Sequence, residues 1–240
     1  MRLALFSDLH LEQPHWGCWQ PPELDVDLVL LAGDIGSLAG GLEWAASSFQ
    51  RRSVAYVVGN HEYYHSRLMP LAALRRKYAR KGVHLLERNT FEMPGLRVLG
   101  CTLWSGFDLL GKDKITASML AALLSINDYR LIGTKSGKRL FPQDTLDLHR
   151  RSVSWLDREL AKPFDGKTVV LTHFAPHRNC AEPRFEKSAL SPYFVTDLAW
   201  LMDKHRIDFY SGNGCRVISN QRGYQHERTE GFQPDCVIEL

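Results

Sequence analysis

Residues Arg2–His10 read RLALFSDLH, an apolar run that ends abruptly in Asp8 and His10. A short run of this kind, rich in leucine and phenylalanine, is typical of a buried β-strand. The same pattern returns three times along the chain, in Asp27–Ala32 before Gly33-Asp34, in Ser53–Val58 before Gly59-Asn60-His61-Glu62, and in Thr168–Thr172 before His173. The sequence therefore predicts four strands that each lead directly into polar residues.

Short apolar runs alternate with helical periodicity through the rest of the chain. Strands are predicted at Arg2–Ser7, Asp27–Ala32, Ser53–Val58, Arg97–Cys101, Thr168–Thr172 and Arg216–Ser219. Helices are predicted at Gly41–Gln50, Arg67–Lys81, Asp144–Ala161 and Tyr193–His205, whereas Gly106–Arg139 is less regular. Alternation of this kind indicates a layered α/β protein, and the lack of a linker favours a single domain over residues 1–240.

The composition is ordinary for a soluble protein. The 240 residues carry a net charge of +3 and no clustered basic stripe of the kind that nucleic-acid binding requires. Five cysteines without CxxC spacing argue against a disulfide framework and a thiolate zinc site. The apolar run at the N-terminus is too short for a signal peptide or a membrane span. We therefore expect a cytoplasmic protein with neither nucleic-acid nor membrane partners.

The residues after the four strands have a shared chemical logic. Ligand sites in α/β sheets form beyond the carboxyl ends of the strands, so these residues are expected to converge. Carboxylate oxygens and imidazole nitrogens suit divalent metals such as Mn, Fe and Zn, and one carboxylate can bridge two ions about 3.5–4 Å apart. Each motif alone could be a simple turn with a surface histidine, but their order along the chain favours one metal site.

The combined motifs resemble those of the calcineurin-like metallophosphoesterases. The resemblance rests on Asp8-Leu9-His10, Gly33-Asp34, Gly59-Asn60-His61-Glu62 and Thr172-His173, and also on Asn127-Asp128-Tyr129, the helix around His149–Leu160 and Asn220-Gln221-Arg222-Gly223-Tyr224. The last of these segments is similar to a bacterial Ser/Thr phosphatase-like subgroup. The resemblance implies a four-layer α+β sandwich, in which two mixed β-sheets are flanked by helices and the metals lie at one edge.

The resemblance also implies roles for the individual residues. Asp8 and His10 would bind one divalent metal ion, Asn60 and His173 a second, and Asp34 would bridge the two. A metal-activated hydroxide would then hydrolyse a phosphomonoester or phosphodiester, with His61 protonating the leaving oxygen. Glu62 would orient a histidine from behind the metals, or would simply be a solvated carboxylate. Arg222 would bind a phosphate or stabilise the terminal turn. No organic cofactor is implied.

One block of the family pattern is missing from this sequence. The family has a late Gly-His-x-His turn that supplies one histidine to each metal, and a deletion of about ten residues near 206–208 would account for its loss. Three residues could substitute as ligands, namely His177, His205 and His226, and so could a histidine of a second subunit. The loss leaves a second functional reading open, in which the chain is a catalytically impaired or inactive binding or scaffold protein. A site that keeps a single metal is a third.

Overall fold

The computed structural model describes residues 1–14, 18–185, 187–205, 216–224, 227–228 and 231–240. The strands are β1 Arg2–Phe6, β2 Leu28–Ala32, β3 Ser53–Val57, β4 Ser66–Arg67, β5 Val83–Leu86, β6 Asn89–Met93, β7 Leu96–Cys101, β8 Ile132–Gly133, β9 Lys167–Thr172, β10 Gly223–Tyr224, β11 Glu227–Arg228 and β12 Val237–Glu239. The helices are α1 Leu38–Ser48, α2 Ala72–Ala79, α3 Ile115–Ser125, α4 Asp128–Leu131, α5 Pro142–Leu160, α6 Ser191–Phe194 and α7 Ala199–Lys204, with short 3₁₀ turns at His61–Tyr63, Lys112–Lys114, Arg178–Cys180 and Pro183–Phe185.

The chain forms two compact units. The first contains residues 1–102, 164–173 and 219–240, and the second contains residues 103–163 and 174–218. The first unit carries both large sheets and all the strand ends that were singled out in the sequence. Whether the two units form one domain stays a prediction.

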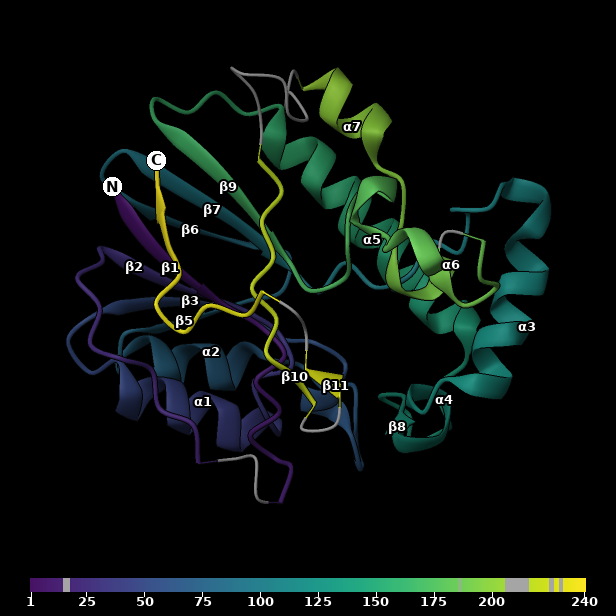
Figure 1. Cartoon of the computed structure of the whole chain (residues 1–240), viewed down its shortest axis with the longest axis horizontal. Helices are drawn as coiled ribbons and strands as arrows, with labels where there is room; N and C mark the ends of the chain where they lie inside the picture. Colours follow the sequence, from purple (N-terminus) through teal and green to yellow (C-terminus); the bar gives the residue numbers. More distant parts are fainter. Residues whose placement is uncertain (15–17, 186, 206–215, 225–226, 229–230) are drawn as a thin grey trace. The chain divides into compact units, whose positions relative to one another are not determined.

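Two mixed sheets build the first unit. The larger has the order β12-β1-β2-β3-β5, in which β1, β2, β3 and β5 are parallel and β12 runs antiparallel to β1. The smaller has the order β6-β7-β9, with β7 parallel to β9 and antiparallel to β6. Figure 1 shows α1 and α2 on one side of the larger sheet and the smaller sheet on the other. The predicted pair of mixed sheets is therefore present.

The strands are apolar because the central ones are covered on both faces. All five residues of β2 are buried, as expected for a parallel strand between two layers. One face meets the smaller sheet in a core of Leu3, Leu5, Leu28, Leu30, Ala32, Ala55, Val57, Leu86, Leu96, Val98 and Leu171. This packing fixes the direction of the parallel strands, and it therefore holds their carboxyl ends at one edge of the unit.

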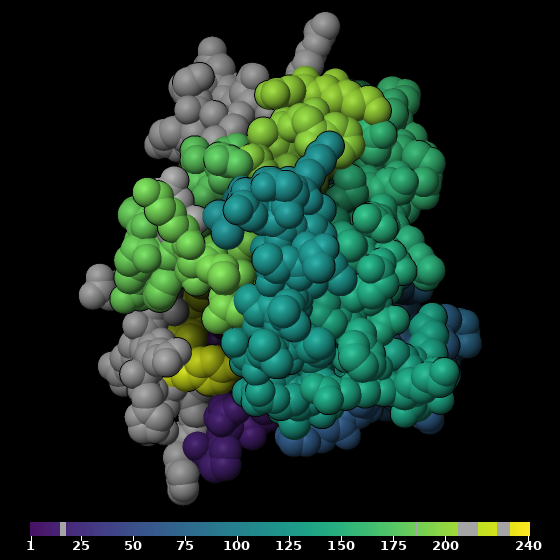
Figure 2. Space-filling view, turned by 90° about the vertical axis from the view of Figure 1, so that its right-hand side faces the viewer, coloured from purple at the N-terminus to yellow at the C-terminus, as the bar shows by residue number. Residues whose placement is uncertain are grey.

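The second unit is mainly helical. Helix α5 buries Leu146, His149 and Leu156 along one face, and the Asp144 carboxylate accepts a hydrogen bond from the backbone N–H of Phe141 at its start, at 2.9 Å. Figure 2 shows a face of this unit that α3 helps to form. Helix α3 lies inside the segment that was expected to be irregular. Its sequence, ITASMLAALLS, is apolar all round and gives no helical stripe.

Two other predicted elements differ from the structure. The helix predicted over Tyr193–His205 is split into α6 and α7, because Val195 forms an isolated parallel bridge with Ala175. The strand predicted at Arg216–Ser219 is wrong, since these four residues are exposed and form no ladder. The next residue, Asn220, contacts the end of β1, where its carbonyl accepts from the Ser7 amide at 3.1 Å.

Candidate metal centre

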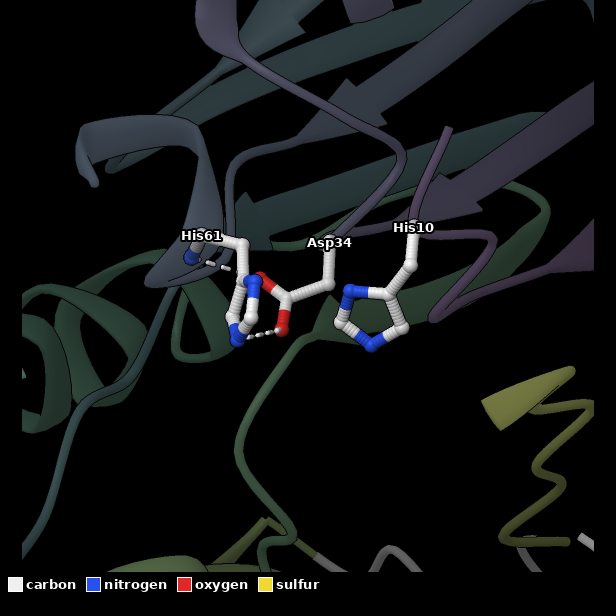
Figure 3. Close-up of side chains that lie close together, drawn as sticks. All are labelled: His10, Asp34 and His61. Atoms are coloured by element: carbon white, nitrogen blue, oxygen red, sulfur yellow. Dashed lines mark hydrogen bonds and ion pairs between the residues drawn. The ribbon is translucent and has the colours of Figure 1, made fainter. Parts of the chain in front are cut away.

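The first unit brings the predicted site residues to one edge. Asp8 and His10 follow β1, Asp34 follows β2, Asn60 and His61 follow β3, and His173 follows β9. β1, β2 and β3 are parallel neighbours, so their carboxyl ends lie at one edge of the larger sheet. His173, after β9, reaches the same edge, where its Nδ1 contacts the carbonyl of Ala32. Figure 3 shows His10 and His61 on either side of the Asp34 carboxylate. Asp34 is thus the shared centre of the arrangement.

The first of two ligand clusters contains Asp8, Asp34 and His173, with one ligand atom from each within 4.8 Å of the others. His173 Nδ1 donates to the carbonyl of Ala32 at 2.9 Å, which directs Nε2 into the cluster. Nε2 lies 3.0 Å from Asn60 Oδ1 and 3.5 Å from Asp34 Oδ2. Because Nδ1 already carries a hydrogen, the oxygens around Nε2 make this position suitable for a second proton or a metal ion.

The second cluster contains His10, Asp34 and His61, again with ligand atoms within 4.8 Å. His61 Nε2 is 3.9 Å from Asp34 Oδ2, and the His61 backbone N–H donates to Asp34 Oδ1 at 2.9 Å (Figure 3). His10 Nε2 lies 4.0 Å from Asp8 Oδ1, which links the two clusters. The donor set therefore offers two neighbouring sites that share Asp34.

The backbone at this edge is strained. Asp8, His10 and Asp34 have φ values of 52°, 49° and 54°, in the left-handed region that side chains other than glycine rarely adopt. The strain is held by paired backbone hydrogen bonds, from Asp8 N to Gly33 O and from His10 N to Asp34 O, each 3.0 Å long. Strain that surrounding structure maintains is concentrated at functional sites.

Glycine is required at position 59 because the side chains of Asp34 and His173 approach its backbone closely. A Cβ atom there would overlap Asp34 Oδ1 and would lie 2.8 Å from His173 Nε2. Glycine therefore leaves room for the carboxylate and the imidazole to meet, which explains why it precedes Asn60 in the motif.

The charges of the cluster fit a divalent cation. Burial raises the pKa of the Asp8 carboxyl, and Oδ2 of Asp8 is buried with no hydrogen-bond partner among the described residues. Burial would also raise the pKa of Asp34, but His173 and the other histidines hold it well below its usual range. Burial lowers the pKa of His173, and Asp34 more than offsets this and raises it to about 10. Buried carboxylates with an unsatisfied oxygen are stabilised by a bound cation, so the residues fit the divalent metals that their N and O donors favour.

Glu62 acts on the backbone rather than on a histidine. Its Oε2 accepts from the amides of Asp34 at 3.0 Å and Gly59 at 2.7 Å, and its Oε1 accepts from Ile35 N at 2.9 Å and Tyr56 Oη at 2.7 Å. Burial, together with the Asp34 charge, raises the pKa of Glu62 to about 7. The predicted histidine-orienting role is therefore corrected, because these four hydrogen bonds hold the Asp34 and Gly59 turns instead. Nor is Glu62 solvated, since it is buried.

Two residues at the site were not identified from the sequence as site residues. Glu12 Oε1 lies 3.2 Å from His10 Nδ1 and 3.0 Å from His61 Nδ1. The hydroxyl of Tyr224 lies 2.8 Å from His61 Nε2, and its ring stacks on His10 with centroids 4.2 Å apart. Glu12 follows His10 by two positions and Tyr224 ends the Asn-Gln-Arg-Gly-Tyr segment, so a signal existed for both. Arg222 donates to the carbonyl of Leu9 at 3.3 Å, which agrees with its structural alternative.

The candidate substitute ligands belong to the second unit or fall outside the described residues. His177 belongs to the second unit, where its Nδ1 accepts from the amide of Asn179 at 3.2 Å. His205 is also in that unit, with Nε2 2.7 Å from Asp157 Oδ1. His226 and the predicted deletion near 206–208 fall in the parts of the chain that the structure does not describe. Substitution by any of these stays a prediction.

Comparison with known proteins identifies the family. Residues 1–212 match the calcineurin-like phosphoesterases, and the chain belongs to this family. It is 25% identical over 283 residues to an uncharacterised protein, L509, of Acanthamoeba polyphaga mimivirus, covering 99% of this chain and 96% of that protein. Its fold is similar to that of a phosphopantetheinyl hydrolase from Mycobacterium tuberculosis, with a TM-score of 0.67 at 18% identity over 93% of this chain and 90% of that one. The predicted family and fold class are confirmed.

The family implies divalent metal binding, and the two clusters are the candidate ligands among the described residues. Within the same residues, no helix is long and apolar enough to cross a membrane.

Proposed function

We propose that this protein is a metal-dependent phosphoesterase that hydrolyses phosphomonoesters or phosphodiesters of small molecules. The observation that carries the proposal is the position of Asp34, whose carboxylate is shared by the Asp8–His173 cluster and the His10–His61 cluster. Family membership supports this class of reaction. The structural neighbour is named a hydrolase. At 18% identity it supports a similar fold only and does not indicate a substrate for this chain.

The proposed ligands are supported by the side chains that lie together at this edge. Asp8, His10, Asp34, Asn60 and His173 would hold two divalent ions, with Asp34 common to both. Such ions, when bound, supply Lewis-acid stabilisation of phosphoryl oxygens and lower the pKa of water. Gly59 keeps the cluster close, and the strained turns after β1 and β2 fix the direction of the carboxylates before a substrate arrives.

His61 is proposed to act on the leaving group. Glu12 occupies its Nδ1, so its Nε2 is the nitrogen that faces the Asp34 edge, 3.9 Å from Oδ2. A histidine held in this way can pass a proton to the leaving oxygen, a contribution of about 10²–10⁴-fold in rate. His61 is therefore assigned to proton transfer. Asp34 is assigned to holding the metals where the substrate would react.

The test combines metal analysis with turnover. Protein purified with Mn²⁺ is expected to hold close to two ions per chain and to hydrolyse bis(4-nitrophenyl) phosphate or 4-nitrophenyl phosphate. Asp34→Asn should lose both properties because it removes the negative charge that the two clusters share. Asp25→Asn is the matched control, since Asp25 is a surface carboxylate with a side chain 92% exposed.

The missing Gly-His-x-His block gives the alternative its basis. Less than one ion per wild-type chain, together with no hydrolysis of either ester across Mn²⁺, Zn²⁺ and Fe²⁺, would contradict the proposal. That result would favour a binding or scaffold protein with an incomplete metal site.

A further inference from the structure

Tyr224 lies directly on the candidate centre. Its ring stacks on His10 at an interplanar angle of 15°, and its hydroxyl is 2.8 Å from His61 Nε2. The segment before it is fixed to the strained turn after β1, because Gly223 N donates to Asp8 O and Arg222 N donates to Ser7 O, each at 3.1 Å. Tyr224 itself is 36% exposed. It therefore contacts the cluster on one side and solvent on the other.

The Tyr224 hydroxyl lies at Nε2 of His61, the nitrogen that is proposed to act on the leaving group. The Glu12 carboxylate oxygen Oε1 lies 3.0 Å from His61 Nδ1. It can only accept, so His61 Nδ1 carries a hydrogen and Nε2 is left to meet the leaving group. Nε2 already meets Tyr224. A leaving oxygen is therefore reached most directly through the phenol.

We propose that Tyr224 is a catalytic residue of the proposed phosphoesterase reaction, in which its hydroxyl contacts the leaving-group oxygen and gives it a proton. His61 and Glu12 form the chain of hydrogen bonds behind it. This inference rests on the proposed function, and it adds a third member to the proton path that the family motifs alone do not indicate.

The step is a proton relay without oxidation or reduction. As the bond from phosphorus to the leaving oxygen breaks, both electrons of that bond stay on the oxygen. The oxygen takes the hydrogen of the Tyr224 hydroxyl, and the Tyr224 oxygen takes the hydrogen from Nε2 of His61, which starts with a hydrogen on each nitrogen. Glu12 keeps its hydrogen bond to Nδ1, and His61 regains its proton from water through Tyr224.

The experiment uses Tyr224→Phe, which keeps the ring on His10 and removes only the hydroxyl. Turnover is measured on two pairs of esters, 4-nitrophenyl phosphate with phenyl phosphate and bis(4-nitrophenyl) phosphate with diphenyl phosphate. A phenolate leaving group needs a proton more than 4-nitrophenolate does. We expect the variant to lose about 10²-fold in kcat on the phenyl ester of the accepted pair and to change little on the nitrophenyl ester.

Two further measurements exclude a merely structural effect. Mn²⁺ binding by calorimetry should be unchanged in Tyr224→Phe, and the ¹⁵N signal of His61 Nε2 should move because its hydrogen bond is lost. Tyr78→Phe is the matched control, as its hydroxyl bonds Glu43 at 3.0 Å between α2 and α1. That control should leave both leaving groups and the His61 signal unaffected.

The outcomes separate the two proposals. If Tyr224→Phe loses kcat equally on the phenyl and nitrophenyl esters, or on neither, the proposed role of Tyr224 is overturned. The phosphoesterase proposal still holds in that case if the wild type is active. A wild type that hydrolyses none of the four esters would overturn the proposed function and the role of Tyr224 with it.

Discussion

Glu12 shows how one carboxylate oxygen can orient two imidazoles. Oε1 accepts from Nδ1 of both His10 and His61, whose rings lie 4.5 Å apart and tilted by 67°. This contact fixes the hydrogen of each ring on Nδ1. It leaves Nε2 of His61 3.9 Å from Asp34 Oδ2 and Nε2 of His10 4.0 Å from Asp8 Oδ1. A proposed metal ligand and the proposed proton donor therefore depend on the same side chain.

Replacing Glu12 should disturb both functions at once. We expect Glu12→Ala to weaken Mn²⁺ binding by about 10–100-fold, the usual effect of losing a carboxylate that orients a ligating histidine. The same change should lower kcat on a phenyl ester, because His61 loses its partner. Calorimetry and steady-state kinetics measure the two effects.

The neighbouring Glu23→Ala gives a control, since Glu23 is exposed. A Glu12→Ala protein that keeps Mn²⁺ affinity while the control also keeps it would contradict the linked role. Imidazole ¹⁵N spectra of metal-free protein would show directly whether His10 and His61 leave the Nδ1–H form.

Site residues could be predicted from the sequence where they directly follow an apolar strand. Asp8, Asp34 and His173 each follow an apolar run, and the structure brings all three together. Glu12 and Tyr224 are 212 positions apart in the chain, and only folding brings both to His61. Glu62 was singled out by its motif, but its role was predicted incorrectly because four hydrogen bonds to Asp34, Gly59, Ile35 and Tyr56 are a tertiary feature.

At the scale of elements, the site depends on how closely the two sheets pack. Gly100 lies in β7, and a Cβ atom there would stand 2.5 Å from Leu86 Cβ and 3.0 Å from Val57 Cγ2. Leu86 and Val57 belong to β5 and β3, so glycine sets the spacing of the sheets near the strand ends.

Gly100→Ala should therefore destabilise the fold. Adding one methyl group to a filled core costs about 1–3 kcal/mol, and here the backbone of one sheet must shift. Urea unfolding followed by circular dichroism should show a lower midpoint at an unchanged slope. An unfolding free energy equal to that of the wild type would contradict the packing described for these three strands.

Strands with strong apolar runs were predicted closely, and elements without them were missed. β1, β2, β3 and β9 lie within one residue of the predicted bounds. β6, with the sequence NTFEM, has no buried residue, so its pattern carried little signal. The wrong strand at Arg216–Ser219 had β-branched residues but pairs with no strand in the described part of the chain, and partners cannot be read from local sequence.

For the whole molecule, the question is what a metallophosphoesterase loses with the Gly-His-x-His block. The sequence leaves each proposed metal with fewer histidines than the family provides, yet Asp34 still joins two clusters. Open coordination positions are normal at catalytic metals, where water fills them. We therefore expect the loss of the block to weaken metal binding before it affects the stability of the fold.

Metal binding should measurably stabilise the folded chain. The cluster places the half-buried Asp8 beside the buried Asp34, and a divalent cation removes their repulsion only when the strand ends are assembled. Mn²⁺ at about 100 times its Kd should add about 2.7 kcal/mol, or roughly 5–10 °C in Tm for a chain of this length. Thermal scans of chelator-treated protein with and without Mn²⁺ measure the shift. His173→Ala should abolish this shift in Tm, and the control Asp25→Asn should keep it. A wild type that shows no shift at saturating Mn²⁺ would contradict the metal centre. The family assignment would remain intact.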